Sequence, residues 1–262
     1  MDINCWKHRL EELPLGDLHL YQELGSTNQK AEELFQQGAP QFTLVAADSQ
    51  TKGRGRQGRS WITRPGKALA FSLILHPPSD FPAERLEMFS GLGALALAEA
   101  VQAECGVPAQ IKWPNDVLVE GKKVAGVLVE LHWSGTDIQA VVIGVGINVH
   151  KGSITKTDQL NFPAGSLEEL CGKKVSRLDL LCRTLQSMCS WYPRLAEEAF
   201  LSSWDSCLAF KGEQVELQAG GEVVDRGELV GLASSGCLVL RSRTGEEREY
   251  NSGEIRLRRA RR

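Results

Sequence analysis

The sequence predicts an α/β (α+β) protein in which a large domain of helices and strands precedes a small all-β domain. Strand-like apolar runs alternate with helical patterns over the first 207 residues. From Lys211 onward, short alternating runs separated by glycines replace them. A chain of 262 residues, 42% of them hydrophobic, is long enough for both. We therefore expect two domains, residues 1–207 and 208–262.

Charge and cysteine content exclude several classes of protein. The net charge of −3 gives no global positive field for nucleic acid, so a basic site must be local. The seven cysteines are odd in number and never occur as C-x-x-C, which argues against a disulfide framework and a zinc site. The first 20 residues have no continuous apolar segment, so neither a signal peptide nor a membrane span is expected. These features are typical of a cytoplasmic protein.

The N-terminal region offers little room for a separate module. Pro14 and Gly16 interrupt the first 20 residues, which leaves too little chain for a helix-turn-helix ahead of the core. We therefore expect no sequence-specific DNA binding. A helical stretch at 29–37 follows Ser26-Thr27-Asn28, and Gly38 ends it. From spacing alone, Ser26-Thr27-Asn28 is interpreted as the N-cap of this helix.

A basic, glycine-rich loop spans Gln50 to Trp61, between apolar runs at 42–47 and 68–75. Its glycines let backbone amides approach a ligand, and its arginines suit carboxylate or phosphate oxygens. The glycine spacing also matches dinucleotide and P-loop motifs, but a strand-like run follows where both need a helix. We interpret the segment as an anion-binding loop, with a solvated basic loop as the alternative.

A second polar cluster follows a long helical pattern at 83–104, which Gly106 and Pro108 end. Residues 111–119 hold this cluster between two strand-like runs, and the turn 120–122 and another strand at 123–131 follow. A hairpin of this kind places two cations beside a carboxylate and an amide. These residues are Lys112, Asn115, Asp116 and Lys123. The alternative is a salt-bridged hairpin tip without a ligand.

The remaining segments complete the expected fold. A strand at 138–143 leads to Gly144-Val145-Gly146-Ile147-Asn148, where the glycines admit a flat ligand and Asn148 offers a hydrogen bond. Residues 176–207 are helical, with a second helix starting at Pro193 and with Trp191 and Trp204 in the core. Five strands are expected in a small barrel, at 214–217, 222–230, 238–241, 248–251 and 255–258, and the arginine-rich tail 256–262 is interpreted as a solvated end.

Five of these motifs, in order over about residues 20–150, closely resemble the biotin protein ligases, which attach biotin to biotin-dependent carboxylases. They are Ser26-Thr27-Asn28, Gly53 to Trp61, Lys112 to Asp116, Lys123 to Gly126 with Glu130, and Gly144 to Val149. The resemblance implies a mixed sheet flanked by helices, like the core of class II aminoacyl-tRNA synthetases, and an SH3-like C-terminal barrel, where Ser252-Gly253-Glu254 also fits. It implies that biotin and ATP give biotinyl-adenylate and pyrophosphate, after which a lysine of a biotin carboxyl carrier domain is acylated.

The resemblance also assigns roles to residues. A carboxylate attacking the α-phosphate brings two anions together, so fixed positive charge is needed there. Lys123, Arg56, Asp116 and Lys112 are the expected catalytic residues, and Asp116 either holds Mg²⁺ or orients the incoming lysine. No dedicated protein metal site is expected. The implied binding residues for biotin and ATP are Ser26, Thr27, Asn28, Gln50, Gly53, Arg54, Gly55, Arg56, Trp61, Asn115, Lys123, Gly126 and Asn148.

Two competing functions differ in class from this one. A lipoate-type ligase would share the core fold, but the Gly-Arg-Gly-Arg loop and the C-terminal barrel favour biotin. A non-enzymatic nucleic-acid-binding protein is opposed by the acidic net charge and the lack of a known binding motif. Within the resembled family we expect the monofunctional form, without the N-terminal DNA-binding domain of its repressor members; a homodimer stays open.

Overall fold

The computed structural model describes residues 1–154, 162–252 and 256–259. The larger unit contains, in chain order, α1 (Ile3–Leu10), β1 (Leu18–Leu24), α2 (Thr27–Gln36), β2 (Leu44–Gln50), β3 (Ala68–Leu75), η1 (Ala83–Arg85), α3 (Glu87–Cys105), β4 (Gln110–Lys112), β5 (Asp116–Val119), β6 (Lys122–Ser134), β7 (Asp137–Asn148), α4 (Leu167–Cys171), α5 (Arg177–Trp191), η2 (Tyr192–Arg194) and α6 (Glu198–Ser206). The smaller unit contains β8 (Gln214–Ala219), β9 (Glu222–Leu232), β10 (Leu238–Arg241), β11 (Glu247–Tyr250) and β12 (Arg256–Arg259).

A seven-stranded mixed sheet organises the larger unit, as expected. Its strand order is β1-β2-β3-β7-β6-β5-β4. The β1–β2 pair is parallel because α2 crosses over between the two strands, whereas the other pairs are antiparallel and joined by hairpins or longer connections. Strand β7 therefore lies at the centre of the sheet, between β3 and β6.

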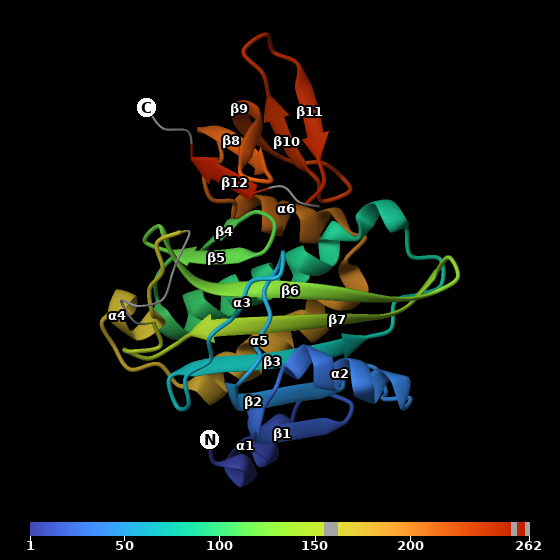
Figure 1. Ribbon diagram of the computed structural model, residues 1–262, viewed down its shortest axis with the longest axis vertical. Coiled ribbons are helices and arrows are strands. Elements are labelled where there is room, and N and C mark those ends of the chain that lie inside the picture. Colours follow the sequence, from blue (N-terminus) through green and yellow to red (C-terminus); the bar gives the residue numbers. More distant parts are fainter. Residues whose placement is uncertain (155–161, 253–255, 260–262) are drawn as a thin grey trace.

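Helices cover the two faces of this sheet unequally (Figure 1). On one face α2 packs Ala31 and Leu34 against Val45, Ile74 and Val142. On the other face α3 and α5 pack together against the sheet and enclose the main core. Since α3 lies between the sheet and other helices, it is apolar almost all round rather than along one stripe. None of the described helices is long and apolar enough to cross a bilayer.

The five C-terminal strands form one antiparallel sheet in the order β11-β10-β9-β8-β12, as the sequence predicts. This sheet lies against α6, at one end of the larger unit (Figure 1). The buried Trp113 indole donates a hydrogen bond from Nε1 to the Gly236 carbonyl, 3.1 Å away. Buried Leu217, Leu229 and Leu257 belong to the same apolar cluster as the main core. The two units therefore share one hydrophobic interior.

Element boundaries differ from expectation mainly in the short helices. Helices α1 and α4 were not predicted, and both are short, with eight and five residues. The second helix of the 176–207 region begins at Glu198, because Pro193 lies within the 3-10 turn η2. Trp204 is buried as expected, whereas Trp191 is only half-buried. Gly253, Glu254 and Ile255, and tail residues 260–262, lie outside the described residues.

Close packing between α3 and α6 gives a stability prediction. A Cβ atom at Gly91 would lie 2.5 Å from the ring of Trp204, which is fully buried. We expect Gly91→Ala to lower the free energy of unfolding, because overpacking costs about 1–3 kcal/mol and exceeds the roughly 1 kcal/mol that alanine gains in a helix. Urea unfolding measures the change, with Ser90→Ala on the same helix as control. Increased stability of Gly91→Ala would contradict the packing.

Candidate functional site

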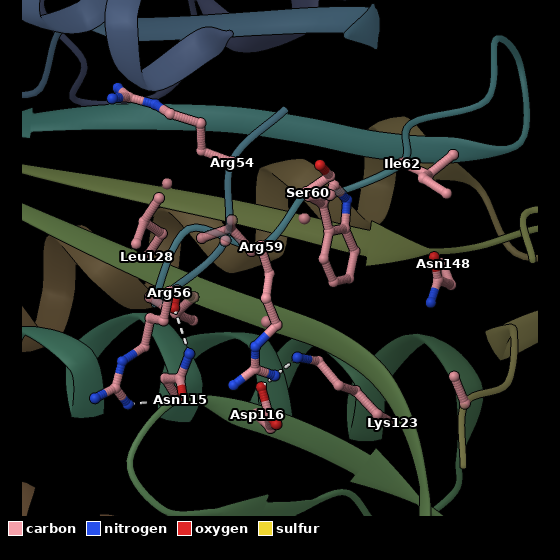
Figure 2. A pocket seen from close by; sticks show the side chains of 18 of the residues that line it. Arg54, Arg56, Arg59, Ser60, Ile62, Asn115, Asp116, Lys123, Leu128 and Asn148 are labelled. Atoms are coloured by element: carbon pink, nitrogen blue, oxygen red, sulfur yellow. Dashed lines mark hydrogen bonds and ion pairs between the residues drawn. The ribbon is translucent and has the colours of Figure 1, made fainter. Parts of the chain in front are cut away.

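The described residues form a cavity of about 420 Å³ on the α2 side of the sheet. This volume is within the range usual for small-molecule sites. Figure 2 shows side chains from the 50–63 loop, the β5–β6 hairpin and the end of β7 around it. Residues near both ends of the chain line the same cavity, from Ser26 to Arg258.

The start of α2 forms one wall of the cavity. Ser26 is the N-cap, and its Oγ accepts from the Gln29 amide at 3.5 Å. Thr27 contacts Gln50 twice, since the backbone amide and the hydroxyl of Thr27 lie 2.8 Å and 3.1 Å from Gln50 Oε1. Thr27 and Asn28 are both buried. The N-cap interpretation is correct, and the same residues also line the cavity.

The basic loop is a small hairpin folded over the cavity. Gly55 donates its amide to the Arg59 carbonyl at 2.7 Å, and Trp61 donates to the Gly53 carbonyl at 2.9 Å. Gly58 turns the chain with φ +69°. Gly53 itself does not line the cavity; a Cβ there would lie 2.3 Å from the Trp61 carbonyl oxygen, so glycine allows the two stems of the hairpin to meet.

The Trp61 indole lies across β7. A Cβ at Gly146 would come within 2.3–2.4 Å of this ring, so only glycine leaves room for it. The ring also approaches Lys123, whose Nζ lies 5.5 Å from the ring centroid. The arrangement gives the cavity an apolar aromatic surface.

Two lysines enclose one carboxylate at the β5–β6 hairpin. Asp116 Oδ1 lies 2.5 Å from Lys123 Nζ, and Asp116 Oδ2 lies 3.7 Å from Lys112 Nζ. Burial opposes ionisation of Asp116, but the two ammonium groups outweigh it and lower its pKa. The hairpin is thus salt-bridged, as the alternative interpretation has it, and its cations also line the cavity.

Lys112 is almost fully buried, and this burial lowers its pKa from 10.5 to about 8. The Asp116 carboxylate acts against the shift, whereas the positive charges of Arg258, Lys123 and Arg59 add to it. An anion entering the cavity would relieve this repulsion between cations. The local excess of positive charge therefore favours an anionic ligand.

The loop arginines are held by oxygen acceptors from distant segments. Arg54 Nη2 lies 3.1 Å from Glu130 Oε2, and Arg56 Nη1 donates to Asn115 Oδ1 at 3.2 Å. Arg56 Nη2 also donates to the Ser252 carbonyl at 3.0 Å. The C-terminal unit thus contacts the loop directly.

All predicted binding and catalytic residues except Gly53 line this one cavity. Asn148 lies at the end of β7, and Gly126 leaves space for Lys123 Nζ, which a Cβ would approach to 3.1 Å. Sequence reasoning missed other lining residues. Gly144 and Gly146 were predicted to admit a ligand, whereas a phenylalanine and a tail arginine carry no such signal in isolation. The lining residues that were not predicted include Arg59, Leu128, Phe162, Leu257 and Arg258.

Comparisons with known proteins give matches to both units of the chain. Residues 21–148 match the biotin/lipoate A/B protein ligase family, and residues 210–258 match the biotin protein ligase C-terminal domain. The bifunctional ligase/repressor BirA of Bacillus spizizenii is 33% identical over 91% of this chain and 74% of its own length. The biotin–[acetyl-CoA-carboxylase] ligase of Paracoccus denitrificans is 33% identical over 85% of this chain and 93% of its own.

Solved structures show the same likeness. The biotin protein ligase of Aquifex aeolicus in complex with biotin and ATP superposes with a TM-score of 0.79 at 33% identity, covering 93% of this chain and 99% of that one.

The lowered pKa of Lys112 predicts a pH-dependent affinity for anions. Between pH 7 and 9 the side chain loses most of its charge, so binding of inorganic pyrophosphate should weaken by up to about tenfold beyond the ligand's own titration. Lys112→Met should bind weakly and lack this extra dependence, as titration calorimetry can measure. Equal pH profiles in the two proteins would contradict the assignment.

The same shift has the opposite effect on stability. Between pH 8 and 10.5 the unfolded state holds the Lys112 proton more often than the folded state, so this group alone makes the free energy of unfolding rise with pH.

Proposed function

Because the chain belongs to the biotin/lipoate A/B protein ligase family, we propose that it is an ATP-dependent biotin protein ligase. It activates biotin as biotinyl-5′-adenylate, releases pyrophosphate, and transfers biotin to a lysine of the biotin carboxyl carrier domain of a carboxylase. The match to the C-terminal domain of biotin protein ligases and the names of the relatives favour biotin over lipoate.

The order of chemical groups from β7 across to β6 carries this proposal. Gly144 faces the polar group around Asn28, and Gly146, two residues further, faces the Trp61 indole. Gly146 pairs with Gly126, which adjoins the Lys123 ammonium. The cavity thus presents hydroxyls and amides, then an aromatic surface, then fixed positive charge. Biotin has the matching order of a neutral urea ring, an apolar chain and a carboxylate.

The cation end supplies the electrostatics of the first step. Attack of the biotin carboxylate on the α-phosphate brings two anions together and forms a pentavalent, negatively charged arrangement. Lys123 is held at 2.5 Å by Asp116, and Arg56 is held by Asn115, so neither must be reorganised during the reaction. Asn115, Asp116 and Asn148 face the nucleotide, and Trp61 shields the anhydride from water.

Magnesium fits as a companion of the nucleotide better than as a resident ion. The described residues contain no cluster of three or more His, Cys, Asp or Glu side chains that suits a metal. Both oxygens of Asp116 already face ammonium groups. Magnesium commonly binds through substrate phosphates and only one or two carboxylates. We therefore assign the ion to the ATP phosphates; its chemistry is to neutralise their charge.

The second step requires the carrier lysine to reach the adenylate carbonyl. Asp116 is the carboxylate in the described part of the cavity, and orienting this lysine is the role that we assign to it. We also propose that the protein acts in the cytoplasm, in keeping with seven free thiols, and that it does not read a DNA sequence, in keeping with its net charge of −3.

Exchange of labelled pyrophosphate into ATP tests the proposed function. Formation of an acyl-adenylate is reversible, so exchange should require biotin and stop when biotin is omitted. Replacing biotin with lipoate should give no exchange. A protein that exchanges with lipoate but not with biotin would be the competing ligase, and no exchange with either would leave only a binding function.

Removal of the Lys123 ammonium should impair adenylation strongly. We expect Lys123→Ala to lose about 2–4 kcal/mol of transition-state stabilisation, as for other donors aimed at developing negative charge. Lys122→Ala removes an exposed cation one position away and is the matched control. Single-turnover formation of adenylate measures both; near-normal rates for Lys123→Ala would show that the lysine only supports the hairpin.

A further inference from the structure

Strand β3 contains one polar residue among eight. Seven of its residues are apolar and Ser72 is the exception, yet Ser72 is fully buried at the middle of the sheet. Ser72 Oγ lies 2.6 Å from Asn28 Oδ1 and 2.8 Å from Thr27 Oγ1. A buried hydroxyl that contacts two residues of the cavity wall, without lining the cavity itself, suggests a positioning role.

Hydrogen-bond accounting fixes the direction of these contacts. Asn28 Nδ2 donates to Glu130 Oε2 at 2.7 Å, so Asn28 Oδ1 faces Ser72 and can only accept. The single proton of Ser72 therefore goes to Asn28. The Thr27 proton is then directed at Ser72 Oγ or at Gln50 Oε1, so it is used by an acceptor of the protein. The lone pairs of Thr27 are left for an N–H donor of the ligand.

The hydrogen bonds of Ser72, Thr27 and Asn28 belong to a longer chain, and both ends of that chain lie at the basic loop. At one end Glu130 accepts from Arg54 at 3.1 Å. At the other end Gln50 Nε2 donates to the Thr63 hydroxyl at 3.1 Å. Ser72 is the central link between these ends, because it alone among the described side chains is hydrogen-bonded to both Thr27 and Asn28.

The opposite residue on β7 makes room for this link. Ser72 pairs with Gly144, and a Cβ at Gly144 would lie 1.9 Å from Asn28 Oδ1. Glycine at this position lets the Asn28 amide lie flat on the sheet, within reach of both Ser72 and Glu130. Gly144 therefore leaves the space that the Asn28 amide occupies, and Ser72 provides the hydrogen bond that orients it.

We propose that Ser72 is a positioning residue for biotin: it sets the proton direction of Thr27 and the orientation of Asn28, and so makes this end of the cavity an acceptor of N–H groups. This role rests on the proposed function, since the urea N–H groups are the donors it selects. Ser72 does not touch the ligand, and it acts through Thr27 and Asn28.

Steady-state pyrophosphate exchange by Ser72→Ala tests the role. We expect KM for biotin to rise about tenfold, as for the loss of one well-formed polar contact, with kcat and KM for ATP within about twofold. Thr43→Val is the matched control, because Thr43 is also fully buried at the sheet and donates its hydroxyl, to the Pro40 carbonyl, but does not line the cavity. Its KM for biotin should stay unchanged. Ser72→Cys, close in volume and a weak donor, gives a second measurement if Ser72→Ala folds poorly.

A double-mutant cycle separates positioning from general destabilisation. If Ser72 acts through Asn28, Ser72→Ala should raise KM for biotin far less in an Asn28→Ala background than in the wild type. An unchanged KM in Ser72→Ala, or a full effect in both backgrounds, would overturn the proposal. Wild-type protein without biotin-dependent exchange would instead refute the proposed function, so the two failures are distinguishable.

Discussion

The ion-pair cluster at Asp116 is the interaction on which the site depends. The ammonium groups of Lys112 on β4 and Lys123 on β6 repel each other in a partly dehydrated cavity. The Asp116 carboxylate, on β5 between these strands, offsets that repulsion. Removing charges from water is costly, and the lowered pKa of Lys112 records that cost. The ammonium groups are nevertheless in place before an anion arrives, so a ligand meets positive charge that is already oriented.

The mixed sheet brings this cluster into line with the polar wall. Strand β7 lies between β3 and β6, and its alternating glycines at 144 and 146 receive the Asn28 amide and the Trp61 indole. The rise of about 3.4 Å per residue along a strand thus sets the separation between the polar and aromatic parts of the cavity. The basic loop then covers both parts. Arg54 of the loop is hydrogen-bonded to Glu130, and Thr63, just after the loop, is hydrogen-bonded to Gln50.

Local sequence patterns predicted the helices and strands well. They predicted only some of the contacts that form the site. Strand β3 has the predicted bounds, because its apolar run of eight residues is short for a helix and is flanked by Gly66 and Pro77. At Ser26 and at the β5–β6 hairpin, a structural and a functional interpretation competed. The N-cap and the salt bridge are observed, and ligand binding by these residues stays a prediction. In the sequence, Ser72 is only one polar residue in an apolar strand. Its role could not be predicted, because its hydrogen-bond partners lie 44 and 45 residues away in the chain. Helix α1 was missed because it is short and buries only Trp6 and Leu10, although Asp2 caps it.

The C-terminal sheet shows why a domain boundary in sequence need not divide a site. Arg56 and Ser252 are 196 residues apart, yet the guanidinium donates to the Ser252 carbonyl while the Ser252 amide donates to Glu87 at the start of α3. Leu257 and Arg258 line the cavity from β12. Docking of this sheet, through the Trp113 bond to Gly236, therefore helps to position the same arginine that Asn115 holds from the sheet. The small unit completes the cavity rather than standing beside it, so displacing it would remove an acceptor from Arg56 and open the wall that β12 provides.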